Sequence, residues 1–475
     1  MKPYANLIGG QWMSSNDALK NVNPSDTDDA VGEYASATPN DVADAGKAAR
    51  AALRGWARTT AYARAEILAA AARELHARRE ELGELLAREE GKTRAEGIGE
   101  VGRASQVFEF FAGEAVRLPG ERAPSVRPGV EVEVIREPVG VVGLITPWNF
   151  PIAIPAWKIA PALAFGNTVI FKPAELTPAS AWALIDILNR AGTPPGVINL
   201  VMGKGSVLGT AIIGEVDALS FTGSIPTGRS IAAKAMERMV KLQLEMGGKN
   251  PLIVLDDADL EIAVDCALNG AFFQTGQRCT ATSRIIVQNQ IHDKFVSALS
   301  ERMQRLRVGH ALAAETEIGP VVDQRQFDSN LRYLEIGERE GARRIGGAVL
   351  RRETPGFYLQ PALFADTSNT MRINREEIFG PIATIIRVDG YDEALEIAND
   401  TEFGLSAGIC TTSLKHARDF QARIQSGLAM VNLPTAGLDF HVPFGGRKAS
   451  SYGPREQGRY AAEFYTTIKT SYVRP

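Results

Sequence analysis

The chain has 475 residues, of which 45% are hydrophobic and 23% charged, and its formal net charge at pH 7 is −4. These values are typical of a globular protein long enough for two large domains, and they offer no basic surface for nucleic acid or an anionic membrane. No apolar run approaches the ~20 residues of a membrane span, the N-terminus lacks a signal-peptide pattern, and the 3 cysteines and 5 histidines have neither disulfide nor metal-ligand spacing, so we expect a cytoplasmic protein without a metal site.

The first quarter of the chain predicts short strands followed by long helices. Residues 7–34 alternate short apolar runs with Gly, Asn, Asp and Pro, as strands and turns do. A helix start is legible where Thr38 can act as N-cap, Pro39 takes the first helical position and Asp41 the third. Helices rich in Ala, Arg and Glu continue to about residue 116. Breaks in them are expected near residues 59–60, Gly91 and Gly97.

Two separated segments have the period-two alternation of exposed strands. Residues 130–136 alternate Val or Ile with charged residues, which predicts a hairpin strand. Residues 466–473 alternate similarly and could pair with that hairpin, within one subunit or between two. Since an exposed strand edge aggregates unless it is covered, we expect a subunit partner there, in a homodimer or homotetramer.

From residue 139 onward, buried strands alternate with helices. This order predicts a parallel, doubly wound sheet, whose ligands bind at the carboxyl ends of the strands. A second alternating run, roughly residues 252–440, predicts a second α/β domain. The predicted strands are Val141–Ile145, Thr168–Phe171, Val197–Val201 and Leu219–Phe221 in the first run, and Ile285–Val287, Ile382–Val388 and Ala407–Thr411 in the second.

Two strand ends of the first run carry residues suited to a dinucleotide. Gly223 and Ser224 follow a strand and open a helix, so free backbone N–H groups could face a pyrophosphate; an ordinary turn is the alternative. Lys172 and Glu175 follow another strand, where a carboxylate can accept bonds from ribose hydroxyls; a surface ion pair is the alternative. Because a carboxylate repels a 2′-phosphate, Glu175 favours NAD over NADP as the cofactor.

A second group of residues is suited to acyl chemistry. Glu245 and Cys279 each stand beside glycines, as a base and a nucleophile at a tight site would. Cys279 also follows Arg278, and a nearby cation favours the thiolate. Asn149 lies in a Pro-flanked loop at a strand end, where its amide could donate to an oxyanion or simply cap the backbone.

Taken together, the motifs of this chain resemble those of the aldehyde dehydrogenase superfamily over roughly residues 7–473. The resemblance implies a Rossmann-type parallel cofactor domain, a second α/β catalytic domain and a small β oligomerisation element. Its motifs are TPWNFP at 146–151, FKPAE at 171–175, FTGS at 221–224, LEMGGK at 244–249, GQRC at 276–279, EEIFGP at 376–381 and PFGG at 443–446. The corresponding domains are a dinucleotide-binding domain at 1–118 and 138–246, a catalytic domain at 247–450, and the β element at 119–137 and 460–475.

The resemblance also implies roles for individual residues. Cys279 would be the nucleophile, Asn149 and the Cys279 N–H the oxyanion hole, and Glu245 the base for deacylation. The cofactor, NAD with NADP possible, would be bound through Lys172, Glu175, Gly223, Ser224, Glu377, Phe379 and Trp148.

For the substrate, a small aldehyde, the C-terminal signature is the main indication. Residues 432–458 are similar to the branch that oxidises 2,5-dioxopentanoate (α-ketoglutarate semialdehyde). The substrate pocket would include Trp157, Arg278 and Phe444. Trp157 is apolar where many succinate semialdehyde dehydrogenases carry Arg, whereas Arg278 could bind a substrate carboxylate or be structural. Succinate semialdehyde, betaine aldehyde and aromatic or aliphatic aldehydes remain alternatives, as do esterase or CoA-acylating chemistry and a non-catalytic protein on this fold.

Overall fold

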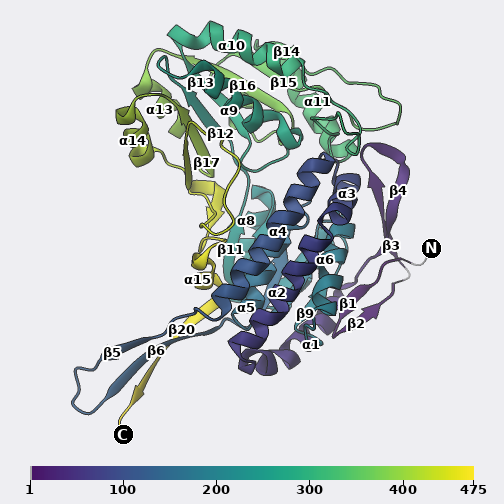
Figure 1. Ribbon diagram of the computed structural model, residues 1–475, viewed down its shortest axis with the longest axis vertical. Coiled ribbons are helices and arrows are strands. Elements are labelled where there is room, and N and C mark those ends of the chain that lie inside the picture. The colour runs from purple at the N-terminus through teal and green to yellow at the C-terminus, as the bar shows by residue number, and fades with distance from the viewer. Residues whose placement is uncertain (1–2, 16) are drawn as a thin grey trace.

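The larger of two main sheets lies in the lower body of the molecule (Figure 1), whose computed structural model describes residues 3–15 and 17–475. Its strand order is β19-β11-β10-β7-β8-β9-β1-β2, parallel from β11 to β9 and antiparallel at both edges. The four predicted strands are confirmed. Their bounds are β7 Val141–Ile145, β8 Thr168–Lys172, β9 Ile198–Leu200, β10 Ala218–Thr222 and β11 Lys241–Glu245, with β1 Asn6–Ile8, β2 Gln11–Met13 and β19 Ser451–Tyr452 at the edges.

Helices bury both faces of this sheet, because side chains alternate along each strand. Val142 and Leu144 face one core, which includes α2 (Ala61–Ala77), α4 (Arg94–Ala115), α5 (Ala153–Ala164) and α6 (Pro178–Arg190). Val141 and Ile145 face the other, with α1 (Pro39–Arg58), α7 (Gly205–Glu215) and α8 (Ile225–Met236). The sheet is therefore the middle layer of three, as the βαβ order predicted.

The N-terminal helices follow the predicted signals with one exception. Thr38 and Asp41 form a capping box at the start of α1, and Gly91, at φ +97°, ends α3 (Arg79–Glu90). The predicted break at Gly97 is wrong, because Gly97 lies inside α4. A β-carbon there would collide with the carbonyl of Gly83 on α3, so this glycine permits close helix packing instead of ending a helix.

The second sheet lies in the upper body (Figure 1) and has the order β14-β15-β16-β13-β12-β17-β18, with only β14 antiparallel. The three predicted strands are confirmed. Helices α9 and α10 pack on one face, and α13 and α14 on the other. The bounds are β12 Asn250–Val254, β13 Thr282–Gln288, β14 Arg343–Gly346, β15 Ala362–Thr367, β16 Ile382–Val388, β17 Ser406–Cys410, β18 Leu428–Val431, α9 Leu260–Phe272, α10 Asn289–Gln304, α11 Gln324–Arg339, α12 Arg372–Arg375, α13 Tyr391–Asn399 and α14 Leu414–Arg423.

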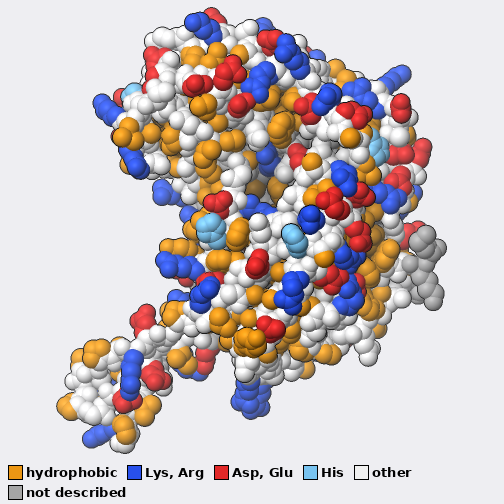
Figure 2. Space-filling model, in the orientation of Figure 1, with side chains coloured by type: hydrophobic (Ala, Val, Ile, Leu, Met, Phe, Trp, Pro, Cys, Tyr) orange, Lys and Arg blue, Asp and Glu red, His pale blue; other side chains and the backbone are white. Residues whose placement is uncertain are grey.

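A three-stranded arm projects from the lower body (Figure 1). Strand β20 (Thr466–Val473) pairs antiparallel with β6 (Glu131–Pro138), which pairs with β5 (Glu121–Pro124), so the predicted pairing of these segments is confirmed within one chain. Hydrophobic side chains lie among charged ones on this arm (Figure 2); Ile468 is 64% exposed and Tyr472 59%. Helix α15 (Ala462–Tyr465) connects β20 to the body, and β3 (Ala18–Asn23) forms a hairpin with β4 (Asp26–Ala35).

No helix within residues 3–15 and 17–475 combines the length and apolar character needed to cross a membrane.

Candidate active site

Cys279 is presented by a strained loop between the two bodies of the fold. The loop follows α9 through a short 3₁₀ turn, Phe273–Gly276, in which Gln274 and Thr275 have φ of 53° and 57°. Gly276 continues the left-handed backbone at φ 63°, and a β-carbon there would collide with the carbonyl of Gly380. Left-handed backbone at non-glycine residues costs on the order of 1–3 kcal/mol each and is concentrated at functional sites.

The two glycines of the 244–249 motif allow the chain to pass between Cys279 and Glu377. A β-carbon on Gly248 would lie 2.6 Å from the main-chain oxygen of Cys279, and one on Gly247 would collide with the Glu377 carboxylate. The N–H of Gly248 donates to Glu377 Oε1 at 2.8 Å. Asn250 Nδ2 donates to the Cys279 carbonyl at 2.8 Å, which holds the nucleophile loop against this segment.

Asn149 is buried beside the same loop. Its Nδ2 donates to the main-chain oxygen of Gln277 at 3.0 Å, two residues before Cys279. The main-chain carbonyl of Asn149 accepts a hydrogen bond from the buried ammonium of Lys92 at 2.7 Å. Lys92 in turn pairs with buried Glu100 at 2.6 Å.

Glu100 fixes the other side of the Asn149 loop. Its Oε1 accepts from the N–H groups of Ile152 and Ala153, both at 3.0 Å. Sequence reasoning missed Lys92 and Glu100, because a charged pair on an Ala- and Glu-rich helical stretch is typical of a solvated face. Both side chains are instead 4% exposed or less.

Glu245 ends β11 and faces the adjoining edge strand. Ser451 Oγ, on β19, donates to Glu245 Oε2 at 2.5 Å. Gly445, from the 443–446 motif, has φ 147°, and a β-carbon there would lie 2.7 Å from Glu245 Oε1. Ser451 was another residue that the sequence did not single out, since it is 206 positions from its partner.

Burial controls the charge states of these groups. It raises the pKa of the Cys279 thiol to about 12, and the carboxylates of Glu377 and Glu245 add to that effect. Burial also raises the pKa of Glu245 well above its usual value, with Glu456 reinforcing and the Ser451 hydrogen bond opposing the shift. The pKa of Glu377 is raised to about 7 by burial, against the stabilising Gly248 N–H. The resting thiol is therefore protonated at neutral pH.

Most of the predicted cofactor residues lie at the carboxyl ends of β7, β8 and β10, whereas Glu377 and Phe379 precede β16. Ser224 precedes α8, and its hydroxyl bonds to the Thr227 hydroxyl at 2.9 Å instead of capping a backbone N–H of the first turn. Gly223 abuts the Phe221 ring, which a β-carbon would approach to 2.5 Å. The N-terminus of this 12-residue helix is thus open to an anion such as a pyrophosphate.

Lys172 and Glu175 converge on the start of α7. Buried Lys172 donates to the Pro173 carbonyl at 2.8 Å, and burial lowers its pKa to about 8, opposed by Glu175. Glu175 Oε1 accepts from Gly205 N at 3.0 Å. Trp148 and Phe379 pack edge to face with ring centroids 5.4 Å apart, and Phe379 has a left-handed φ of 59°. These features together suit a nicotinamide dinucleotide: the carboxylate of Glu175, the ammonium of Lys172, the open N-terminus of α8, and the pair of aromatic rings.

A cavity of about 290 Å³ opens next to Cys279, and it brings together Cys279 and the three predicted pocket residues, Trp157, Arg278 and Phe444. Trp157 and Phe444 contribute two aromatic rings with centroids 5.6 Å apart. Sequence reasoning missed six further polar residues in the wall: Glu96, Glu100, Arg103, Gln274, Thr280 and Gln457.

The carboxylates of this wall are satisfied, whereas its guanidinium groups are not paired with acids. Glu100 has the partners described above. Glu96 accepts from the N–H groups of Gln274 and Thr93, both at 2.9 Å. Within the part of the chain that the structure describes, neither Arg103 nor Arg278 has a carboxylate oxygen within 4 Å. Arg278 donates to the carbonyls of Asn269 and Gly270.

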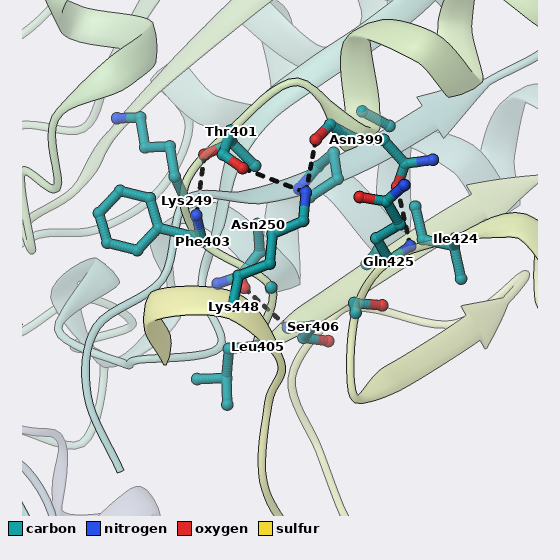
Figure 3. Close-up of a pocket in the computed structure, with 15 residues that line it drawn as sticks. Lys249, Asn250, Asn399, Thr401, Phe403, Leu405, Ser406, Ile424, Gln425 and Lys448 are labelled. Atoms are coloured by element: carbon teal, nitrogen blue, oxygen red, sulfur yellow. Dashed lines mark hydrogen bonds between the residues drawn. The ribbon is translucent and has the colours of Figure 1, made fainter. Parts of the chain in front are cut away.

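A second hollow, lined by Lys249, contains none of the candidate catalytic residues (Figure 3). Lys448 points across it and donates to the carbonyls of Asn399 at 2.6 Å and Thr401 at 3.1 Å. Its volume of about 10 Å³ is at the lower limit for a single water. It is therefore too small for a substrate, and the cavity at Cys279 is the candidate substrate site.

Comparisons with known proteins agree with this geometry. A model of the aldehyde dehydrogenase family matches residues 12–471. The alpha-ketoglutaric semialdehyde dehydrogenase of Bacillus subtilis (strain 168) is 44% identical over 479 residues, covering 99% of this chain and 98% of that protein. The 2,5-dioxopentanoate dehydrogenase of Saccharolobus solfataricus is 40% identical over 478 residues, covering 99% of each.

Solved structures match over the whole chain as well. Betaine aldehyde dehydrogenase from Staphylococcus aureus, in complex with NAD+, superposes with a TM-score of 0.97 at 35% identity and covers 100% of this chain and 95% of its own. An Escherichia coli structure described as an NADP dependent enzyme gives 0.96 at 34% identity, covering 100% and 98%. The chain therefore belongs to the aldehyde dehydrogenase family, and it is an oxidoreductase that oxidises aldehydes with NAD(P)+.

Proposed function

We propose that this enzyme oxidises 2,5-dioxopentanoate to 2-oxoglutarate with NAD+. The observation that carries the substrate assignment is the cavity wall, where two guanidinium groups lack an acidic partner among the described residues while both lining carboxylates are satisfied. Such a wall favours an anionic ligand, because a buried charge needs a counter-charge. Relatives named for this substrate at 44% and 40% identity agree with the proposal.

Cys279, Asn149 and Glu245 would perform the chemistry. The Cys279 sulfur adds to the aldehyde carbon, and the resulting oxyanion accepts hydrogen bonds from Asn149 Nδ2 and the Cys279 N–H. The bound nicotinamide supplies the hydride acceptor. Glu245 then removes a proton from the water that cleaves the thioester, releasing the acid and the free thiol.

The Cys279 thiol has to lose its proton before the sulfur can attack the aldehyde. Burial and the two neighbouring carboxylates hold the thiol pKa at about 12, so the attacking thiolate is a minor species at neutral pH. The Asn149 amide, now engaged by the Gln277 carbonyl at 3.0 Å, would turn to the oxyanion when the substrate adds. Ser451 would keep the Glu245 carboxyl oriented at the end of β11.

The remaining residues would bind the cofactor. Glu175 and Lys172 would hold the adenosine ribose, and Gly223 and Ser224 the pyrophosphate at the open end of α8. Glu377 would bind the nicotinamide ribose, beside the aromatic pair of Phe379 and Trp148. The Glu175 carboxylate would repel a 2′-phosphate, which supports NAD+ as the preferred cofactor.

Betaine aldehyde is the second candidate, since the rings of Trp157 and Phe444 could receive a quaternary ammonium. The Arg103 guanidinium, however, already lies over the Trp157 ring, 5.9 Å from its centroid. A second cation beside it would be repelled. This contact favours the anionic substrate.

We also propose that the enzyme is a homo-oligomer and that it is cytoplasmic. The exposed hydrophobic side chains of the β5–β6–β20 arm support a homodimer or homotetramer joined through that arm. The three free thiols suit a reducing cytoplasm.

The test is a kcat/KM panel over 2,5-dioxopentanoate, succinate semialdehyde, betaine aldehyde, benzaldehyde and pentanal, each with NAD+ and NADP+. We expect 2,5-dioxopentanoate with NAD+ to give the highest value. A higher value for betaine aldehyde or for pentanal would overturn the substrate assignment.

A further inference from the structure

We propose that Arg103 binds the carboxylate at the far end of the aldehyde substrate and thereby sets the specificity of the enzyme. Arg103 lies within α4, the long N-terminal helix of the lower body (Figure 1), and lines the cavity that also holds Cys279. The inference rests on the proposed function, because it concerns the end of the substrate opposite the aldehyde.

The Arg103 guanidinium is held in a defined position before any ligand binds. Its Nη1 donates to the carbonyl of Leu438, and its Nη2 donates to Gln457 Oε1 at 3.1 Å. Its central carbon lies over the Trp157 ring, 5.9 Å from the ring centroid. These contacts use two of the five N–H donors of a guanidinium, so a carboxylate can still be bound.

The charge of Arg103 is not neutralised by the protein around it. Glu100 and Asp439 lie close enough to favour the charged form, yet burial outweighs them and lowers the pKa of Arg103. Glu100 is itself occupied by Lys92 and two main-chain N–H groups. A partly buried guanidinium without an ion pair is costly unless a ligand supplies the anion.

Gln457 positions this guanidinium through its side-chain oxygen. It is 1% exposed and has a left-handed φ of 59°, a strained backbone for a residue with a side chain. The preceding residue, Glu456, accepts from Trp157 Nε1 at 2.7 Å and pairs with buried Lys158, which locks the segment. In the described structure Gln457 Nε2 has no hydrogen-bond partner, so this amide nitrogen can still donate to a ligand.

Arg278 is the competing candidate in the same wall. It is adjacent to Cys279 in the chain, and its Nη2 already donates to two main-chain carbonyls, those of Asn269 and Gly270. Arg103 comes from a separate helix and shares the wall with Leu438 and Gln457. The aldehyde carbon at Cys279 and the carboxylate stand at opposite ends of a five-carbon substrate, which favours Arg103.

The test compares an anionic and a neutral aldehyde of equal length in the full-length enzyme. Arg103→Met should lower kcat/KM for 2,5-dioxopentanoate by about 30-fold or more, mainly through KM, while changing the value for pentanal by less than about threefold. Arg103→Lys, which keeps the charge without the planar fork, should lose less. Arg117→Met, which removes an exposed guanidinium just beyond the same helix, should leave both values unchanged.

The outcomes separate the inference from the function on which it rests. If the wild-type enzyme oxidises 2,5-dioxopentanoate no better than pentanal, the proposed function fails. If the wild type prefers the anionic aldehyde and Arg103→Met keeps that preference, or loses both substrates equally while folded, the role of Arg103 is overturned. Should the variant not fold, inhibition of the wild-type enzyme provides the test. 2-Oxoglutarate should inhibit pentanal oxidation at least ~10-fold more tightly than pentanoate does. Equal inhibition by the two compounds would contradict the role of Arg103.

Discussion

Asn149 donates its side-chain amide to the main-chain oxygen of Gln277 at 3.0 Å, so the candidate oxyanion donor rests against the loop that carries the candidate nucleophile. The same residue is held from the other side by the Lys92 ammonium at 2.7 Å. Asn149 is thus fixed between a buried ion pair and the loop that carries Cys279, and its amide needs only a change of acceptor to meet a charge on the substrate. Preorganised donors of this kind are the largest single contribution in many acyl-transfer sites.

Replacing Asn149 by Ala should lower kcat by ~100- to 1,000-fold, the usual effect of removing one oxyanion donor. Affinity for NAD+, measured by fluorescence titration, should stay near that of the wild type, because Asn149 itself is not among the proposed cofactor residues. A kcat within threefold of the wild type would remove Asn149 from the oxyanion hole.

The reactivity of Cys279 should depend on its neighbouring carboxylates. Glu377 raises the thiol pKa, so Glu377→Gln should lower it and increase the thiolate fraction at any pH below it. The rate of Cys279 alkylation by iodoacetamide, measured above the Glu377 pKa of about 7, should therefore rise in the variant. Glu376→Gln is the matched control, because Glu376 pairs with Arg372 and does not act on the thiol. Equal rates in both variants would contradict the electrostatic account.

The Lys92–Glu100 pair should stabilise the fold as well as the Asn149 loop. Both side chains are 1% exposed, and removing one partner of a buried pair costs about 3–5 kcal/mol. Glu100→Gln should therefore lower the urea midpoint of unfolding clearly, and kcat along with it. Glu335→Gln, which breaks the exposed pair with Arg339, should change neither, and a similar shift in the two variants would count against this role.

Cofactor choice should change at Glu175. Its carboxylate now accepts from Gly205 N at the start of α7, in the position proposed for the adenosine ribose. Glu175→Ser removes the charge that would repel a 2′-phosphate, so the NAD+/NADP+ ratio of kcat/KM should fall by tenfold or more. An unchanged ratio would take that role away from Glu175.

The sequence predicted β7 to β10 of the first sheet and β13, β16 and β17 of the second, because these apolar runs are bounded by turn residues. It did not single out β11, β12, β14, β15, β18 or β19. It failed at Gly97, which serves packing against Gly83 instead of a break, since a lone glycine has the same appearance in both cases. The motifs located Cys279, Glu245 and Asn149, but not the residues around them. Ser451 and Arg103 act through contacts 206 and 354 positions apart, which no local pattern encodes.

The proposed mechanism requires that Cys279 forms a thioester which Glu245 helps to hydrolyse. Glu245→Gln keeps an oxygen for the Ser451 hydrogen bond but removes the base. The decisive measurement is the intact mass of this variant, and of its Cys279 peptide, after mixing with NAD+ and 2,5-dioxopentanoate. We expect one burst of NADH per active site and an acyl adduct on Cys279 that persists. A burst without an adduct, or an adduct on another residue, would contradict the proposed mechanism.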